Sequence, residues 1–282
     1  MRYHRPTSKA DALAVLAAEG DRARPLVGGT DLLVGLRHST IAPTWIVDLK
    51  GITDLPEPIT LTEDGIRIGP TMTLGELVAH LDVRRSFPAL SEAALTVGSV
   101  AIRNRASLVG NLCNASPAAD TVPALLVLGA VVTIESVDGA RTVSLADFFL
   151  GPRRTQCHAS ALVTRIDLPW PPAGTGSAFQ RLTRRRGVDL GTVSVAAAVS
   201  SDGRMSLGLG AVGPKPLMAE VAEPVDLTDE PQLERVLDQL LNVAAPITDV
   251  RASREYREAM LRVLGKRAVL AAAGRRTRME AA

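Results

Sequence analysis

The stretch that decides the fold is AIRNRASLVGNLCNASPAADTVPALLVLGA, residues 101–130. Its central part combines a glycine, two asparagines, an aspartate and several small residues, and an apolar stretch expected to form a helix follows at about 121–128. Gly110 lets the backbone approach a ligand closely, Asn111 and Asn114 offer donors and acceptors, and Asp120 offers a carboxylate. On its own, this pattern fits a buried polar loop as well as it fits a ligand-binding loop.

A second polar turn occurs in LVGGTDLL, residues 26–33, between a strand expected at 24–27 and a helix expected at 31–37. Such a turn exposes successive backbone N–H groups that can bind an anion. The alternative is a simple turn in which Thr30 or Asp31 caps the helix. Together the two segments predict one extended polar ligand with a diphosphate. No lysine follows a glycine-rich phosphate loop, so N–H groups and helix dipoles are expected to hold the phosphates.

The remaining elements follow from caps, turns and apolar spacing. Thr7 or Ser8 begins a helix that Gly20 ends, and Thr73 with Glu76 forms a capping box. Asp64-Gly65 predicts a hairpin turn with a positive-φ glycine. Beyond the linker-like PWPPAGTGS, residues 169–177, the pattern changes. We expect an antiparallel meander with strands near 178–183, 192–200 and 204–212, the last two joined by Asp202-Gly203, and then helices at 230–242 and 253–273. The chain therefore divides near residues 55 and 175.

Composition narrows the class of protein. With 46% hydrophobic residues, 22% charged residues and a net charge of +2, the 282-residue chain is globular, and no nucleic-acid partner is expected. Two cysteines and four scattered histidines predict neither a metal site nor an iron–sulfur cluster in this chain. No signal peptide or membrane-spanning run is recognised, so a cytoplasmic protein without a transmembrane segment is expected.

Two further segments invite a functional interpretation. GLGAVG, residues 208–213, matches the GxGxxG dinucleotide pattern, but Pro214 follows at once where a helix should begin, so glycines that allow close strand packing or bends are the better interpretation. The basic tail with Arg275, Arg276 and Arg278 is expected to be a frayed, solvated end.

The two loops, in this order and spacing, resemble the FAD-binding medium subunit of the molybdenum hydroxylases, the family of xanthine dehydrogenase and aerobic carbon monoxide dehydrogenase. The resemblance covers essentially the whole chain, and further segments carry it: YHRPTSKADALAVL, VDLKGITDL, IGPTMTLGEL, LVTRIDLPWPP and AVGPKPLMAEVAE. It implies an α+β fold. Two α/β FAD-binding subdomains of the vanillyl-alcohol-oxidase (PCMH) type, residues 1–55 and 56–175, would precede a C-terminal antiparallel-sheet-and-helix domain, residues 176–282.

The resemblance also implies which residues contact FAD. By position these are Val27, Gly28, Gly29, Thr30, Asp31, Ser107, Leu108, Val109, Gly110, Asn111, Asn114, Asp120 and Arg181. Residues 27–31 are called the first loop below and residues 107–111 the second loop. Val109 departs from the family's usual TIGGN, which has a glycine there. Arg181 falls where the family often has a lysine near the pyrimidine edge of the flavin, and Gln180 is the alternative position.

The role implied by the resemblance is electron transfer. A small partner subunit with [2Fe–2S] clusters and a large molybdopterin subunit would complete a heterotrimer, present as a dimer of heterotrimers. This chain would pass electrons from the clusters to NAD, oxygen or a quinone, with no catalytic acid or base of its own. A stand-alone FAD-dependent oxidoreductase of the same fold is the alternative. The arginines at 103–105 and 184–186 form either a solvated basic face or a contact with a partner or acidic acceptor.

Overall fold

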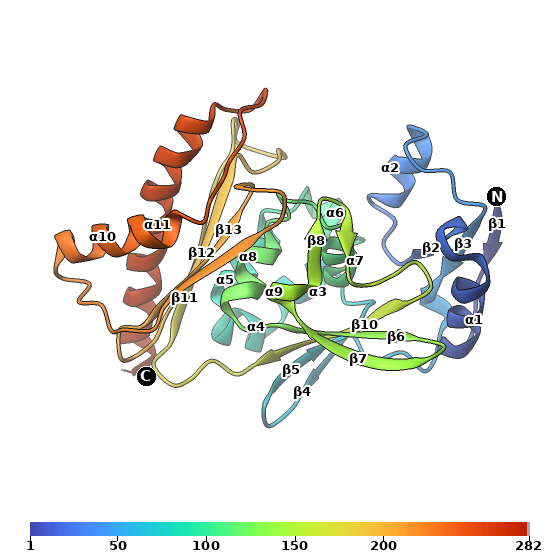
Figure 1. The fold of residues 1–282 in the computed structure, drawn as a ribbon. Helices are drawn as coiled ribbons and strands as arrows, with labels where there is room; N and C mark the ends of the chain where they lie inside the picture. The colour runs from blue at the N-terminus through green and yellow to red at the C-terminus, as the bar shows by residue number, and fades with distance from the viewer. Residues whose placement is uncertain (281–282) are drawn as a thin grey trace. The chain divides into compact units, whose positions relative to one another are not determined.

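The structure is a computed structural model that describes residues 1–280, and the side chains of residues 1–276 (Figure 1). Its contacts divide the chain into two compact units, each built from three separate stretches. The first unit contains residues 1–77, 100–115 and 130–169, and the second contains residues 78–99, 116–129 and the chain from Trp170 onward. The division into 1–55, 56–175 and 176–282 stays a prediction.

The N-terminal part of the first unit is a small parallel sheet with one packed helix. The strand order is β1–β3–β2, with β1 at Arg2–His4, β2 at Ala23–Leu26 and β3 at Trp45–Asp48. Helix α1 (Lys9–Glu19) buries Ala12, Leu13 and Leu16 against Val47 and other residues of this sheet. As predicted, the Ser8 hydroxyl caps α1, accepting a hydrogen bond from the Asp11 N–H at 3.2 Å, and Gly20 ends it with a φ of 51°.

The second sheet of the first unit is antiparallel, in the order β4–β5–β10–β6–β7. Its strands are β4 (Ile59–Leu61), β5 (Gly65–Ile68), β6 (Val131–Ser136), β7 (Gly139–Ser144) and β10 (Leu162–Pro169). The shorter elements of this unit are α2 (Leu32–Arg37), η1 (Gly20–Arg22), η2 (Leu49–Gly51), α6 (Val100–Arg103), α7 (Leu108–Cys113), α9 (Leu145–Phe148), β8 (Phe149–Gly151) and β9 (Arg154–Thr155). Helix α3 (Leu74–Ala79), capped by Thr73 and Glu76 as predicted, spans the passage into the second unit.

The predicted hairpin at 59–68 is confirmed as β4 and β5, but the reason given for Gly65 is wrong. Gly65 is not among the glycines with positive φ. It is needed because β10 passes very close: a Cβ added at Gly65 would lie 2.0 Å from the carbonyl oxygen of Leu168. The constraint on Gly65 is therefore a tertiary contact, which a local turn pattern does not reveal.

We expect Gly65→Ala to lower the free energy of unfolding by about 1–3 kcal/mol, the usual cost of overpacking, because the backbone of β10 has to move. Urea denaturation of the full chain measures this loss. Gly213→Ala is the matched control, since an added Cβ there meets no atom closer than 3.7 Å and Gly213 has no positive φ. Equal stability of the two variants would contradict the conclusion that the contact with β10 requires glycine at position 65.

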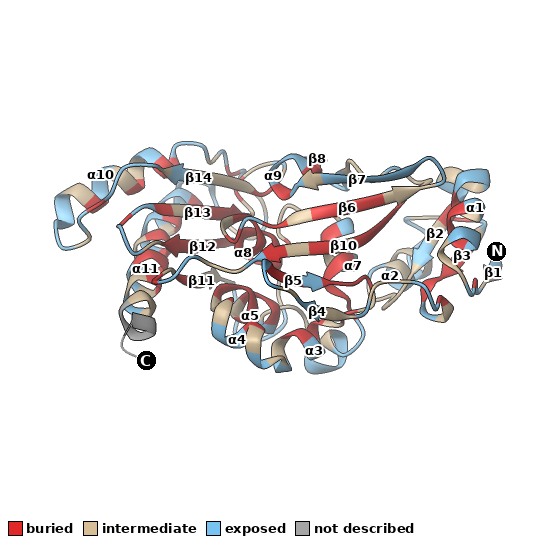
Figure 2. Cartoon of the chain, turned by 90° about the horizontal axis from the view of Figure 1, so that it is seen from below, coloured by how far each residue is buried: buried red, intermediate tan, exposed pale blue. Residues whose placement is uncertain are grey.

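The second unit is an antiparallel sheet covered by helices. Its strands, in the order β11–β12–β13–β14, are Gly176–Leu182, Val193–Val199, Met205–Gly210 and Leu217–Val221. Its helices are α4 (Leu81–Ser86), α5 (Pro88–Leu95), α8 (Thr121–Val127), α10 (Glu230–Leu241) and α11 (Arg254–Glu280). Every residue of β12 is buried, as Figure 2 shows in red. The predicted meander is confirmed, and β14 extends it.

The glycines of the GxGxxG-like segment allow this sheet to pack closely against a helix. Gly208 and Gly210 lie within β13, and a Cβ added at Gly208 would lie 2.1 Å from the carbonyl oxygen of Pro123 in α8. Residues 208–210 therefore belong to a strand that packs closely against a helix, so the interpretation as close strand packing is confirmed for this part of the segment.

The basic C-terminal tail differs from expectation. Helix α11 continues to Glu280, and Arg275 forms an ion pair with Glu92 of α5 and donates to the Ser177 carbonyl at 2.6 Å. Arg276 donates to the Ser200 carbonyl at 2.9 Å, and the side chain of Arg278 lies outside the described residues. The prediction of a frayed end is therefore wrong for Arg275 and Arg276, because both have specific acceptors. Within residues 1–280, no helix is long and apolar enough to cross a membrane.

Candidate functional site

The two predicted loops meet inside the first unit. Gly28 packs directly on the chain that leads into the second loop: a Cβ added there would lie 2.0 Å from the Arg105 carbonyl oxygen and 3.0 Å from the Ala106 Cα. Because any side chain at position 28 would strike backbone, this contact requires glycine. The structure thus brings together two segments that are far apart in the sequence.

The first loop leaves several backbone donors open. Gly29 has a φ of 74°, and the Leu33 and Gly35 N–H groups donate to the carbonyls of Gly29 and Asp31, each at 2.9 Å. Asp31 occupies the N-cap position of α2 without a side-chain capping bond, so the simple capped-turn alternative is not realised by Asp31. Among the described residues, the main-chain N–H groups of Gly29, Thr30 and Asp31 donate to no protein acceptor. They can serve a ligand anion.

The second loop begins the short helix α7. The Ser107 hydroxyl accepts the Gly110 N–H at 3.1 Å, so this hydroxyl caps the helix. Leu108 and Val109 are buried, which places the side chain of Val109 in the core. A Cβ added at Gly110 would approach only the Ser107 hydroxyl, at 2.9 Å. Asn114, just after α7, accepts a hydrogen bond from Arg153 Nη1 at 3.2 Å.

Asp120 and Arg181 lie together in the second unit. Arg181 Nη1 is 3.2 Å from Asp120 Oδ2, and the two side chains are only 9% and 8% exposed. Arg181 also donates to the carbonyls of Thr96, at 2.7 Å, and Asp189. In the described part of the chain, Asp120 Oδ1 and Arg181 Nε are buried without a hydrogen-bond partner. Buried polar atoms are normally satisfied, and these two atoms keep capacity for a further hydrogen bond.

The surroundings of Asp120 change its acidity. Burial raises the pKa of Asp120 to about 6, against the opposing effect of the Arg181 guanidinium. This carboxyl therefore titrates near neutral pH, and its charge is coupled to the arginine beside it.

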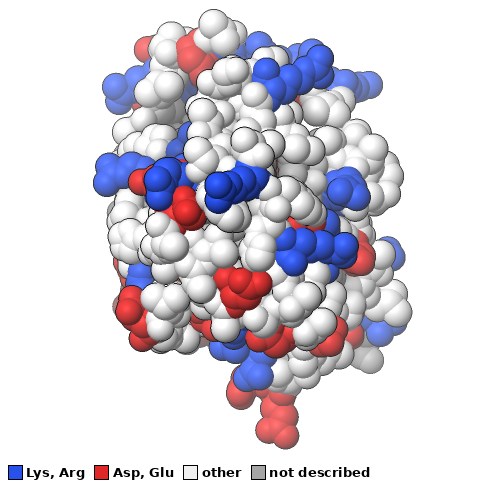
Figure 3. All heavy atoms as spheres, turned by 90° about the vertical axis from the view of Figure 1, so that its right-hand side faces the viewer, with Lys and Arg blue, Asp and Glu red and all other residues white. Residues whose placement is uncertain are grey.

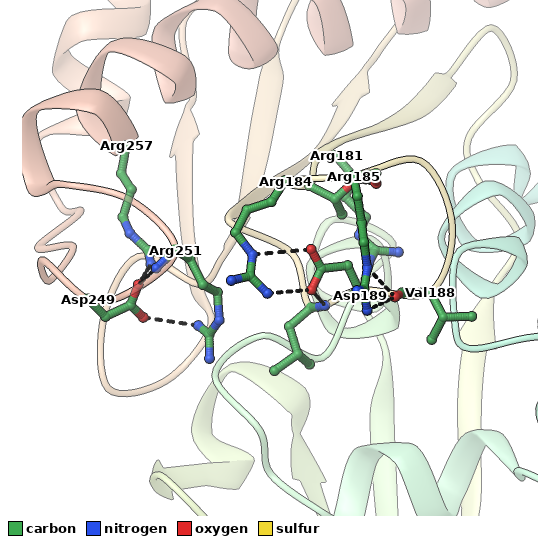
Figure 4. Close-up of polar contacts among 10 residues, drawn as sticks. Arg181, Arg184, Arg185, Val188, Asp189, Asp249, Arg251 and Arg257 are labelled. Carbon is green, nitrogen blue, oxygen red and sulfur yellow. Dashed lines mark hydrogen bonds and ion pairs between the residues drawn. The ribbon is translucent and has the colours of Figure 1, made fainter.

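The arginine-rich segment after β11 forms an ordered loop, shown in Figure 4. Arg184 pairs with Asp189 at 3.0 Å, and Arg185 donates to the Val188 carbonyl at 2.8 Å. A cavity of about 380 Å³ in the second unit adjoins this loop. It is lined by Leu95, Thr96, Gly98, Arg181, Thr183, Gly187 and Val188. Two of the three arginines at 184–186 thus fix the loop that lines this cavity together with Arg181.

The first unit has a cavity of its own, also of about 380 Å³. Its lining includes Val27 and Gly28 of the first loop together with Lys50, whose ammonium lies 3.2 Å from the Val27 carbonyl oxygen. No lysine follows the first loop in sequence, but the fold brings Lys50 to its Val27 carbonyl. Lys50 lies two residues after Asp48, the last residue of β3, and the carboxyl ends of parallel strands share one edge of a sheet. That shared edge was the signal that could have identified Lys50 from sequence.

The distribution of charged side chains and of metal-ligating residues further describes the surface and the candidate sites. In Figure 3, basic and acidic side chains are interspersed over one face among mostly uncharged residues. Among the described residues, no three histidine, cysteine or acidic side chains group together as a metal site would require.

Comparisons with known proteins give the class. Residues 1–171 match the family described as the FAD-binding domain in molybdopterin dehydrogenase, and residues 177–272 match the CO dehydrogenase flavoprotein C-terminal domain. The chain therefore belongs to the FAD-binding subunits of the molybdopterin dehydrogenases, which are oxidoreductases.

Individual relatives are similar along nearly their whole length. The carbon monoxide dehydrogenase medium chain of Afipia carboxidovorans is 33% identical, covering 95% of this chain and 94% of that protein. The xanthine dehydrogenase FAD-binding subunit of Escherichia coli O157:H7 is also 33% identical, with 96% and 97% covered. A crystal structure of Cu,Mo-CO dehydrogenase matches with a TM-score of 0.91 at 33% identity over 98% of both chains. The expected α+β fold with a C-terminal antiparallel-sheet domain is thereby confirmed.

Proposed function

We propose that this chain is the FAD-carrying electron-transfer subunit of a cytoplasmic molybdenum hydroxylase. It would take electrons from the [2Fe–2S] clusters of a small partner subunit and pass them to NAD, oxygen or a quinone. A large partner subunit would hold the molybdopterin, and the complex would be a dimer of heterotrimers. The observation that carries the proposal is the contact of Gly28 with Arg105, which joins the two loops of the family's FAD motif in one unit.

The residues present fit FAD. Open N–H groups of the first loop suit a diphosphate, and Gly28 lets this loop lie against the chain before the second loop. In the second unit, the unsatisfied atoms Asp120 Oδ1 and Arg181 Nε suit the polar edge of a flavin. When bound, FAD supplies the two-electron redox chemistry.

Individual roles follow from these environments. Val27 through Asp31 and Ser107 through Asn111 would line the nucleotide backbone, and Asn114 would extend that polar surface. Arg181 would place a fixed positive charge beside the flavin, where it stabilises negative charge that develops on reduction. Asp120 would accept a hydrogen bond from the ring or a hydroxyl, and would orient Arg181 through their 3.2 Å contact. Because Arg181 rather than Gln180 pairs with Asp120, we assign the cation to Arg181.

Purification tests the proposal. The full chain, expressed with its neighbouring subunits, is expected to be yellow, to release FAD on acid treatment, and to co-purify with iron–sulfur and molybdopterin proteins. Flavin absorbance measures the bound FAD, and metal analysis of the purified complex measures the iron and molybdenum of the partner proteins. A colourless chain that takes up no FAD on titration would contradict the cofactor assignment, and robust substrate turnover by the isolated yellow chain would instead favour the stand-alone oxidoreductase.

A further inference from the structure

The Arg181 guanidinium is held from three segments of the second unit. Its Nη1 donates to the Thr96 carbonyl at 2.7 Å and lies 3.2 Å from Asp120 Oδ2, and its Nη2 donates to the Asp189 carbonyl. Thr96 follows α5, Asp120 precedes α8, and Asp189 lies in the loop between β11 and β12. A guanidinium is planar and rigid, so acceptors on both Nη atoms fix the direction of its remaining Nε–H.

The Asp189 carbonyl is oriented by the side chain of the same residue. The Leu190 N–H donates to Asp189 Oδ1 at 3.0 Å. This N–H and the Asp189 carbonyl belong to one planar peptide unit, in which they point in opposite directions. Because the carboxylate binds the N–H on one side, the carbonyl oxygen is turned to the other side, where it accepts from Arg181. The contact with Arg181 therefore depends on the Asp189 carboxylate.

Arg184 fixes the Asp189 carboxylate in turn. Its Nη2 donates to the same Oδ1 at 3.0 Å and its Nε donates to Oδ2 at 3.3 Å, as the dashed lines of Figure 4 show. The Asp189 side chain is only 5% exposed. Hydrogen bonding to Arg184 lowers the pKa of Asp189, so this carboxylate is ionised at neutral pH. The contact is a bidentate ion pair, which fixes the orientation of both groups.

The residue that follows this peptide unit faces the Asp120–Arg181 pair. A Cβ added at Gly191 would lie 3.1 Å from Asp120 Oδ1 and 3.6 Å from Arg181 Nε. Within the described residues, these are the two atoms of the pair that have no hydrogen-bond partner. Gly191 carries no side chain, so space remains beside both atoms, and the position of the loop determines the extent of that space.

We propose that Asp189 is a positioning residue: its carboxylate orients the peptide bond that follows it, and the carbonyl of that bond holds the Arg181 guanidinium against Asp120. This inference rests on the proposed function, because Arg181 serves a flavin only if the chain binds FAD. It also gives Arg184 a role inside the chain, beside the solvated basic face and the partner contact that the sequence suggests.

The first test needs no cofactor. In the apo chain, the Arg181 guanidinium opposes the increase in the pKa of Asp120 that burial causes. Asp189→Ala frees the peptide bond and lets the guanidinium move away, so the pKa of Asp120 is expected to rise from about 6 to about 7. NMR titration of the Asp120 carboxyl carbon measures this pKa. Removing a negative charge has the opposite direct effect, because a nearby anion raises the pKa of a carboxyl group.

An unchanged or lowered pKa of Asp120 in Asp189→Ala would overturn the proposal. Asp202→Ala is the matched control, because Asp202 also pairs with an arginine, Arg204, and accepts its backbone N–H at 3.2 Å. Asp202 follows β12, at the end of the sheet away from Arg181, so this variant is expected to leave the pKa of Asp120 unchanged. Partly exposed ion pairs contribute little to stability, so both variants are expected to fold, which circular dichroism checks.

Two further variants show whether Asp189 acts through Arg181. In an Arg181→Met background, Asp189→Ala is expected to cause no further rise in the pKa of Asp120, because the guanidinium that would move is absent. Asp189→Asn keeps an oxygen that accepts the Leu190 N–H, so the pKa of Asp120 is expected to stay at or below about 6. A further rise in the double variant, or a rise in Asp189→Asn as large as in Asp189→Ala, would overturn the proposal.

The FAD-loaded chain gives an independent measurement. Asp189→Ala is expected to lower the midpoint potential of the bound flavin by about 30 mV, which corresponds to a tenfold weaker preference for the reduced flavin. Asp202→Ala is expected to leave this potential unchanged. A wild-type chain that binds no FAD contradicts the proposed function, while the pKa of Asp120 still tests the role of Asp189. A wild-type chain that binds FAD, with an Asp189→Ala variant that changes neither the pKa nor the potential, contradicts only the positioning role.

Discussion

Gly28→Ala is expected to reduce FAD affinity at least about a hundredfold, which corresponds to about 2.7 kcal/mol. The added Cβ would lie 2.0 Å from the Arg105 carbonyl oxygen, a backbone atom that cannot move away as a side chain does. The first loop and the chain before the second loop must therefore separate. Flavin fluorescence quenching on titration of the full chain measures the affinity.

The control for Gly28→Ala distinguishes a change in the geometry of the first loop from a general loss of folding. Gly213→Ala adds the same methyl group where the nearest atom is 3.7 Å away, and it is expected to keep wild-type FAD affinity. Circular dichroism should show that both variants retain their secondary structure. If Gly28→Ala binds FAD as tightly as Gly213→Ala does, the contact between the two loops does not shape the FAD site.

Arg181→Met is expected to destabilise the apo chain strongly at pH 8 and weakly at pH 5. Removing one partner of a buried ion pair costs about 3–5 kcal/mol while the other stays charged. Asp120 has a pKa of about 6, so it is ionised at pH 8 and largely protonated at pH 5. The urea midpoint, recorded at both pH values, should therefore fall much further below that of the wild type at pH 8.

The direction of this pH dependence follows from linkage. The folded-state pKa of Asp120 lies above the unfolded value of about 3.9, so the folded state binds the proton more tightly. This stabilising contribution is complete below about pH 4 and is lost as the pH rises through about 6. Without Arg181 the pKa rises further, so the loss continues to higher pH in the variant.

Two variants check the Asp120–Arg181 interpretation. Asp120→Asn combined with Arg181→Met removes both charges and should abolish most of the difference between pH 5 and pH 8. Arg262→Met removes an arginine whose own side chain and whose partner Asp238 are both exposed, and it should leave the urea midpoint nearly unchanged. An Arg181→Met variant with the same loss of stability at both pH values would contradict a buried charge pair.

Local signals in the sequence were sufficient for many elements. Helix α1 begins after Ser8 and ends before Gly20, because caps satisfy backbone groups within a few residues. Gly203, with a φ of 88°, turns the chain between β12 and β13, as the Asp202-Gly203 pair predicted. In each case the determining contact lies within one or two turns of the chain, so the sequence pattern contains the information.

Contacts between distant segments were not predictable in the same way. The role of Gly65 depends on β10, and that of Arg275 depends on Glu92. Lys50 reaches the first loop only because β2 and β3 pair in parallel register. None of these relations produces a periodic pattern, because each depends on which strands and helices become neighbours. The motif resemblance supplied the two loops but not the cavity beside them.

The strand order of the five-stranded sheet has a consequence for synthesis of the chain. β10 lies at its centre, between β5 and β6, yet it is the last of the five strands in the sequence. Until residues 162–169 leave the ribosome, the β4–β5 and β6–β7 hairpins each keep an unpaired inner edge. Exposed strand edges pair readily with other chains, so this interval is when the nascent chain is most prone to aggregate and most in need of a chaperone.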